Sequence, residues 1–267
     1  MCLPTQNNNG SELNRFQELY RLETTLYNNG QNIVSVGTAR LTNKKVIIKS
    51  VKTTSYKKIQ EAAILRRLKS VPGIITFVDT FFVTNTRQMM ITEYFGDCNL
   101  ARFLKTYGPL SEKTSHTIAK QLVATAQTCF NLQILHPKIK TENILINIKS
   151  LQIKIHNFDT ACTFEKDKYP KTSMCLSISP PEYFLTQKIT PDAHYVWTLG
   201  LVLYELLFNC KPFGSKQAIL YQSCYAQSSK PIDINAFVLI AWMLTKNPQQ
   251  RISLSQIQHH PWISKKF

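Results

Sequence analysis

The stretch His136-Pro-Lys-Ile-Lys-Thr-Glu-Asn143, together with Asn157-Phe-Asp159, decides the fold of this 267-residue chain. Two short β-rich runs, 143–148 and 152–156, lie between these motifs, with a turn at Lys149-Ser150. The surrounding sequence is β-rich in the N-terminal part of the chain and mainly helical elsewhere. This change of character predicts two structural parts within one chain.

The N-terminal part predicts a small β-rich unit with a single helix. Short β-rich runs alternate with polar turns from Phe16 to Val51, and two more strand-like runs cover Ile74–Val83 and Arg87–Tyr94. Between them, apolar residues recur at helical spacing over Tyr56–Lys69. The segment 1–15 is polar and Asn-rich and lacks the basic start and the apolar stretch of a secretory signal, so we expect a flexible tail.

The C-terminal part predicts mainly helix, interrupted by the two short strands named above. A change of character near Tyr94–Gly96 predicts a hinge between a small lobe, 16–95, and a larger helical lobe, 96–267. We therefore expect an α+β, bilobal fold that forms one domain, without an internal repeat or a long linker. The predicted helices are Leu100–Tyr107, Ser111–Leu132, Val196–Asn209, Lys216–Gln227, Asn235–Leu244 and Ser253–His259.

The composition favours a soluble, intracellular protein. Hydrophobic residues make up 43% of the chain, which is enough for a sizeable core. The most apolar window, Leu199–Phe208, is too short to span a membrane and carries Glu205, so it predicts a buried helix. Seven cysteines without a Cys-x-x-Cys pair indicate neither a disulfide framework nor a metal site, and they favour a cytoplasmic or nuclear location.

The formal net charge of +16 attracts anionic partners of every kind. The lysines are scattered over predicted strands, helices and loops and are not interleaved with aromatic residues. This pattern favours an ordinary solvated surface. It leaves a basic binder of nucleic acid or of anionic surfaces as an alternative function.

From about Tyr20 to Ile263 the chain resembles the eukaryotic protein kinase family, because its motifs follow one another in the order of that family. The resemblance implies a protein kinase-like fold, and the C-terminal pattern is most similar to calmodulin-dependent Ser/Thr kinases. It also implies an ion pair between Lys49 and Glu61 that links the lobes, and another ion pair between Glu182 and Arg251. The matching positions are Lys49, Glu61, His136–Asn143, Asn157–Asp159, Pro180-Pro-Glu182, Trp197-Thr-Leu-Gly200, Asn247-Pro-Gln-Gln-Arg251 and His260-Pro-Trp262. His136 and Phe158 match residues with a structural, stacking role in the family.

Two departures from the family pattern affect its chemistry. The catalytic aspartate, which accepts the proton of the substrate hydroxyl, is replaced by Lys138, and a protonated lysine has no lone pair for that task. The metal-binding aspartate is replaced by Asn157, a weaker ligand for Mg²⁺. Asp159 supplies a carboxylate two positions later, which either lies in an exposed turn or moves inward in a rearranged loop. Lys140 and Asn143 keep the family's residues, and we expect them to order the loop.

The nucleotide pocket implied by the resemblance is altered as well. Tyr27, Asn29 and Asn32 occupy the three glycine positions of the phosphate-binding loop, and their side chains obstruct the approach of backbone amides to phosphate. Ile47 replaces the small alanine of the adenine ceiling. We therefore expect no cofactor, and the binding of ATP with Mg²⁺ is disfavoured. The other pocket positions are Val34, the gatekeeper Thr92 and Leu145 on the floor.

Two regulatory features of the family are also missing. Pro137 replaces the arginine that grips an activation-loop phosphate, so phosphorylation at Thr172 or Ser177 would lack that anchor. Ser173 is a further residue of this segment that could be modified. Tyr195 replaces an aspartate that hydrogen-bonds the catalytic-loop backbone, so we expect the standard brace of this loop to be lost.

The leading hypothesis is a catalytically inactive kinase homologue, a pseudokinase, that regulates or scaffolds a protein partner such as a kinase or a kinase substrate. We expect the partner surface to lie on the fold itself or on the N-terminal tail. One alternative is an atypical Ser/Thr kinase that uses Lys49, Asn143 and Asp159 in a rearranged site. The other alternative is the basic nucleic-acid or anionic-surface binder described above.

Overall fold

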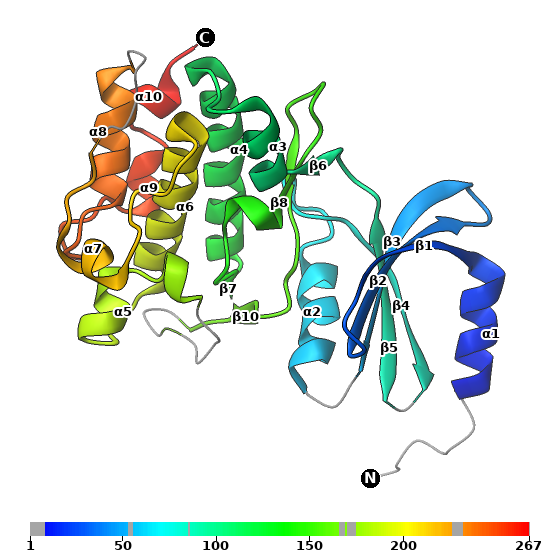
Figure 1. Ribbon diagram of the computed structural model, residues 1–267. Coiled ribbons are helices and arrows are strands. Elements are labelled where there is room, and N and C mark those ends of the chain that lie inside the picture. The colour runs from blue at the N-terminus through cyan, green and yellow to red at the C-terminus, as the bar shows by residue number, and fades with distance from the viewer. Residues whose placement is uncertain are drawn as a thin grey trace. The chain divides into compact units, whose positions relative to one another are not determined.

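The computed structural model describes residues 9–52, 56–84, 86–165, 169, 175–225 and 232–266. The chain divides into an N-terminal unit, Met1–Ser70 with Ile75–Phe95, and a C-terminal unit, Val71–Ile74 with Gly96–Phe267. A β-sheet dominates the first unit and helices dominate the second (Figure 1), which confirms the predicted α+β, bilobal fold. No helix in these ranges is both long and apolar enough to cross a bilayer.

The N-terminal unit is built on a five-stranded antiparallel sheet of order β1-β2-β3-β5-β4. In β3 the buried Val46 and Ile48 alternate with the half-buried Ile47 and Lys49, because successive side chains of a strand point to opposite faces. One face of the sheet therefore supplies the core, and the other carries the site positions. The strands are β1 Tyr20–Asn28, β2 Asn32–Ala39, β3 Lys44–Lys52, β4 Phe77–Thr84 and β5 Arg87–Glu93, and helix α2 covers Tyr56–Arg67.

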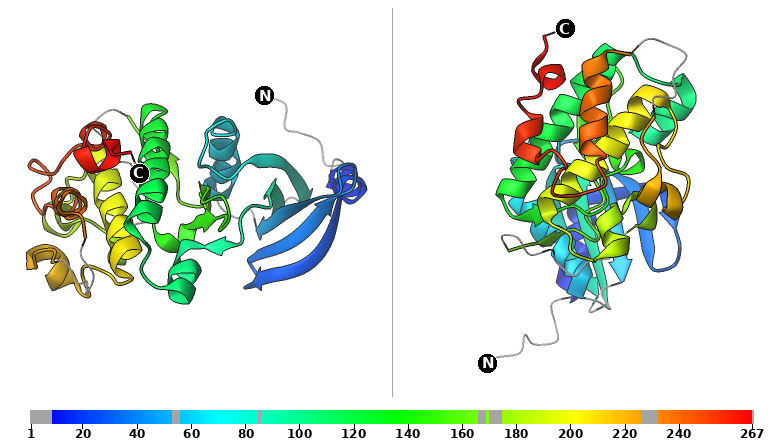
Figure 2. Two further views of the ribbon diagram at one scale, coloured as in Figure 1. Left: turned by 90° about the horizontal axis from the view of Figure 1, so that it is seen from above. Right: turned by 90° about the vertical axis from the view of Figure 1, so that its left-hand side faces the viewer.

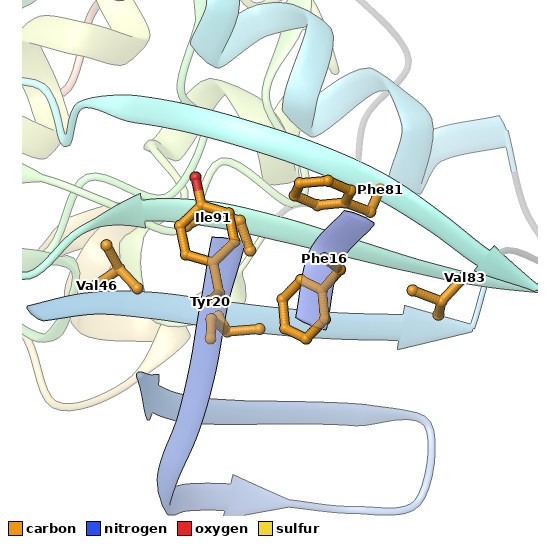
Figure 3. Close-up of a cluster of buried hydrophobic side chains, with 7 residues drawn as sticks. Phe16, Tyr20, Val46, Phe81, Val83 and Ile91 are labelled. Atoms are coloured by element: carbon orange, nitrogen blue, oxygen red, sulfur yellow. The ribbon is translucent and has the colours of Figure 1, made fainter. Parts of the chain in front are cut away.

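Helix α1, Asn9–Leu19, packs on the core face of this sheet. Its Phe16 is buried and stacks on Tyr20 with ring centroids 5.8 Å apart, and Phe81 meets Phe16 edge-on at 5.6 Å. Helix α1 thus completes a hydrophobic core rather than extending into solvent. Figure 3 shows this cluster, whose further members are Val46, Ile48, Val83 and Ile91.

The prediction of a flexible tail over 1–15 is wrong from Asn9 onward. Leu13 and Phe16 are spaced as on one face of a helix, and both pack in the cluster. Burial of this apolar face offsets the loss of conformational entropy on folding. The polar composition of the segment gave no sign of this apolar face. Residues 1–8 lie outside the described residues.

We expect Phe16→Ala to lower the free energy of unfolding by about 3 kcal/mol, because it leaves a cavity beside two aromatic rings. Urea denaturation of the whole chain measures this change. Leu41→Ala is the matched control, since Leu41 is 86% exposed and its truncation should change stability little. A loss below 1 kcal/mol for Phe16→Ala would show that α1 contributes little to the core.

The C-terminal unit is mainly helical and carries two small sheets, of order β6-β8-β9 and β10-β7. The helices are α3 Leu100–Tyr107, α4 Glu112–Asn131, α5 Pro181–Leu185, α6 Pro191–Phe208, α7 Lys216–Tyr221, α8 Ile234–Met243, α9 Leu254–Ile257 and α10 Pro261–Ser264. The strands are β6 Cys98–Asn99, β7 Ile134–Leu135, β8 Ile144–Ile146, β9 Ile153–Ile155 and β10 Cys162–Thr163, and short 3-10 helices cover Thr141–Asn143 and Leu176–Ile178.

Helix α6 lies beside α4 and α8 (Figure 2), and nearly all its side chains are buried. It begins at Pro191, earlier than the predicted Val196, because the Thr190 side chain accepts the Ala193 N–H and proline suits the first helical position. The predicted start of α4 is confirmed, since the Ser111 side chain caps that helix. Helix α7 ends before the predicted Gln227, which lies outside the described residues.

Candidate functional site

The β8–β9 hairpin brings the two deciding motifs of the sequence together in the C-terminal unit. Ile144 pairs with Ile155 across the hairpin, and the His156 N–H donates to the Asn143 carbonyl at 3.0 Å. The segment that ends at Asn143 and the segment that begins at Asn157 therefore emerge side by side.

Two neighbouring side chains of α6 hold the loop that starts at His136. The Tyr195 hydroxyl accepts the His136 N–H at 3.1 Å and donates to the Ile134 carbonyl at 2.7 Å. His194 Nε2 donates to the Pro137 carbonyl at 3.2 Å, so this nitrogen carries the proton. Burial raises the pKa of Tyr195 well above its usual range, which keeps the hydroxyl neutral. A neutral brace thus replaces the family's charged one.

The His136 ring connects the two motifs. Its Nδ1 accepts the Lys138 N–H at 3.3 Å, and its Nε2 donates to the carbonyls of His156 and Asn157, each at 3.2 Å. The Phe158 ring meets it edge-on with centroids 4.6 Å apart. Burial lowers the pKa of His136 to about 4, so the imidazole is neutral near pH 7 and acts as a structural connector.

Lys138 and Asp159 form an ion pair within the C-terminal unit. The Lys138 Nζ lies 3.6 Å from Asp159 Oδ1, and the two side chains are 22% and 43% exposed. The cation at the position of the family's base thus faces the carboxylate that lies two residues after Asn157. The positive charge of Lys138 and the negative charge of Asp159 therefore offset each other locally.

The amides of Asn143 and Asn157 are also engaged. Asn143 Nδ2 donates to the Lys138 carbonyl at 2.9 Å, and Asn157 Nδ2 donates to Asn143 Oδ1 at 3.3 Å. Asn157 has a φ of 64°, in the left-handed region. Lys140 Nζ lies 3.9 Å from the Glu142 carboxylate. Both retained residues, Lys140 and Asn143, therefore have partners inside the loop.

In the N-terminal unit, Lys49 Nζ lies 3.0 and 2.7 Å from the two carboxylate oxygens of Glu61. The Glu61 side chain is only 6% exposed, so this pair is held with little solvent around it. Glu61 lies in α2 and Lys49 in β3, both within the N-terminal unit, so the pair ties the helix to the sheet and does not link the two lobes as expected.

The strand register gathers the predicted pocket residues of the N-terminal unit on one face of the sheet. Val34 lies opposite both Tyr27 and Lys49, and Ile47 lies opposite Thr92. Thr92 is buried, Val34 and Ile47 are half-buried, and Tyr27 is exposed. Leu145, the predicted floor position, is half-buried in β8 of the other unit.

The turn between β1 and β2 has no unengaged backbone amides at its tip. Asn28 Oδ1 accepts the Gly30 N–H at 2.8 Å, while Asn29 Oδ1 accepts the N–H groups of Gln31 and Asn32 at 3.2 and 2.7 Å. Gly30 has a φ of 78°, which glycine adopts without strain. Asparagine side chains thus bind the amides that a glycine-rich loop would offer to a phosphate.

Glu182 and Arg251 form the most deeply buried ion pair of the C-terminal part that the structure describes. Two parallel hydrogen bonds of 2.8 Å join the guanidinium to the carboxylate, and the side chains are 1% and 3% exposed. The guanidinium also donates to the carbonyls of Ala193, Thr245 and Lys246.

Sequence reasoning missed Asn28 and His194. The run Asn28-Asn29-Gly30 is typical of side-chain-to-backbone turns, so the capture of the turn amides had a local signal. His194 had none, because its contact with the loop depends on tertiary packing.

Three residues were considered as possible sites of modification. Ser177 lies in a 3-10 helix, whereas Thr172 and Ser173 lie outside the described residues. Within the described ranges, no three His, Cys, Asp or Glu side chains gather as a metal site would require.

Comparison with known proteins gives a consistent result. Residues 29–263 match the family model of the protein kinase domain. The chain is 29% identical to zebrafish serine/threonine-protein kinase pim-2, over 96% of this chain and 87% of that protein. It is 26% identical to Caenorhabditis elegans serine/threonine-protein kinase prk-2 and 28% identical to human NUAK family SNF1-like kinase 1. It spans 59% and 38% of the lengths of those two relatives, which cover 93% and 92% of this chain. The chain therefore belongs to the protein kinase domain family.

Proposed function

We propose that this chain is a catalytically inactive protein kinase homologue, a pseudokinase, that regulates or scaffolds a protein partner. The observation that carries the proposal is the ion pair of Lys138 and Asp159. Lys138 occupies the position of the base, and its ammonium group, which has no lone pair to accept a proton, faces the Asp159 carboxylate. Loss of a general base slows a reaction by about 10² to 10⁴.

The residues of neither unit fit ATP with Mg²⁺. In the C-terminal unit, Asn157 offers no carboxylate, Asn143 Oδ1 already accepts a hydrogen bond, and Asp159 faces a lysine. A hard dication prefers charged oxygen ligands, so this set is a weak one. In the N-terminal unit, the turn amides are bound to Asn28 and Asn29.

The retained contacts support a protein that still needs its fold. The buried pair of Glu182 and Arg251 and the pair of Lys49 and Glu61 are both formed. The altered positions are those at which the family holds nucleotide, metal and substrate hydroxyl. Loss of chemistry with retention of architecture supports a binding role, and by the same resemblance the partner would be a kinase or a kinase substrate in the cytoplasm or the nucleus.

A second candidate is an atypical Ser/Thr kinase. The relatives named above are serine/threonine kinases, and Lys49 pairs with Glu61 as the family's active members require. This function would require Asp159 to leave Lys138 and become a metal ligand.

Thermal unfolding with and without millimolar ATP or ADP, each with Mg²⁺ or Mn²⁺, tests the choice. A ligand that binds only the native state raises the unfolding temperature by mass action, and we expect no shift. Zebrafish pim-2, measured in parallel, serves as a positive control for the assay. A metal-dependent shift, together with phosphoryl transfer that Asp159→Ala abolishes, would overturn the proposal in favour of the enzyme.

A further inference from the structure

The two edges of the N-terminal sheet differ in how they are covered. At the β4 edge, α1 packs along the strand, and Glu12 Oε2 accepts the Phe82 N–H at 3.1 Å. At the opposite edge, β1 pairs with β2 on one side, and no strand of the described residues adjoins its other side (Figure 1). An uncovered edge strand offers backbone donors and acceptors to a further strand.

Strand β1 is exposed along almost its whole length. Only its first residue, Tyr20, is buried, whereas Leu22 is 51% and Leu26 is 59% exposed. The strand contains no proline and no lysine, two residues that commonly protect sheet edges. Register shifts between Leu22 and Thr25 and between Thr25 and Tyr27 interrupt its pairing with β2, and such bulges bend an edge strand and limit the length over which a further strand can pair.

The charge of strands β1 to β3 and their turns, which include this edge, selects among occupants. From Tyr20 to Lys52 the chain holds one acidic residue and six basic ones, a net charge of +5. Lys49 is paired with Glu61 and Arg21 with Glu23, which leaves four cations. A second copy of this chain, with its own charge of +16, would be repelled, whereas an acidic segment would be attracted. The four cations lie beyond β1 itself, at Arg40 in the β2–β3 turn and at Lys44, Lys45 and Lys52 in β3.

We propose that the outer edge of β1 is a docking site for an extended, acidic segment of a partner protein. The segment adds to the sheet as a strand, through main-chain hydrogen bonds, and its apolar side chains pack against Leu22 and Leu26. This inference extends the proposed binding function by naming a surface, and it rests on that function for its biological purpose.

A fluorescently labelled peptide of nine alternating glutamate and valine residues, blocked at both ends, is the probe. We expect saturable binding to the full chain that weakens as salt rises, with no binding of the lysine–valine counterpart. Leu22→Ser with Leu26→Ser should weaken binding at least tenfold, and Leu41→Ser, at an exposed turn position away from the edge, should leave it unchanged. A peptide that is N-methylated at every residue, which cannot donate main-chain hydrogen bonds, should not bind.

Any of four results would overturn the inference. They are no binding of the acidic peptide at millimolar concentration, equal binding of that peptide to the double serine variant, equal binding by the N-methylated peptide, and self-association of the chain that the double variant abolishes. Circular dichroism spectra that match the parent's show that the variants are folded. The nucleotide experiment tests the region of Lys138 and not this edge, so the failure of one proposal is distinguishable from the failure of the other.

Discussion

Arg251→Met is expected to lower the free energy of unfolding by about 3–5 kcal/mol, because it leaves the Glu182 carboxylate buried without a counter-charge. Every N–H of the guanidinium has an acceptor: Nε donates to Thr245, and the two terminal nitrogens donate to Glu182, Ala193 and Lys246. The guanidinium also lies over the Trp197 ring, 5.0 Å from its centroid. Urea denaturation of the full chain provides the measurement.

The double variant Arg251→Met with Glu182→Leu separates two effects on stability: the cost of leaving the Glu182 carboxylate unpaired, and the loss of the other contacts of the guanidinium. It removes the unpaired carboxylate, so we expect it to regain part of the lost stability. The recovery should be incomplete, because the carbonyls of Ala193, Thr245 and Lys246 still lack their donor. Arg251→Lys should also destabilise, since the three donors of an ammonium cannot replace the five donors of the guanidinium. If Arg251→Met cost less than 1 kcal/mol, the pair would not anchor this unit.

The order of elements was predictable because it follows from local patterns. Periodicity predicted helix over Leu100–Tyr107 with the bounds that α3 has, and Ser111 gave the start of α4. Helix α1 was not predicted, because Asn and Gln residues lie among its few apolar residues. The burial of its apolar face depends on a contact with Phe81, which is distant in the sequence. Local propensity cannot report a contact of that kind.

For the site, the sequence predicted which chemical groups are missing but not what replaces them. That Lys138 is no base follows from its side chain alone. That it faces Asp159 requires the β8–β9 hairpin to place the two loops side by side. The brace by Tyr195 shows the same limit: loss of the aspartate was evident, whereas the hydroxyl's two hydrogen bonds depend on how α6 packs below the loop.

We expect stability to fall steeply on acidification from about pH 6.5 to pH 4, owing to the buried histidines His136 and His194. Burial lowers the pKa of each to about 4, from a usual value of 6.5. Above pH 6.5 both are neutral in the folded and the unfolded chain and contribute no pH dependence. Below pH 6.5 these histidines bind protons in the unfolded chain but not in the folded chain. The free energy of unfolding therefore falls by about 3 kcal/mol per histidine near pH 4.

His194→Gln isolates one of these contributions. An amide of glutamine can still donate to the Pro137 carbonyl, but it does not titrate in this range. Relative to the parent, this variant should lose about 3 kcal/mol less stability between pH 6.5 and pH 4, while His259→Gln, at an exposed histidine, should follow the parent curve. Parallel curves for the parent and His194→Gln would mean that the folded chain accepts a proton at His194. The imidazolium would then have to keep its bond to Pro137 beside the Arg251 charge, which is one of the causes that lower its pKa. The pH profile therefore tests whether the loop brace is neutral, which the geometry around Tyr195 and His194 requires.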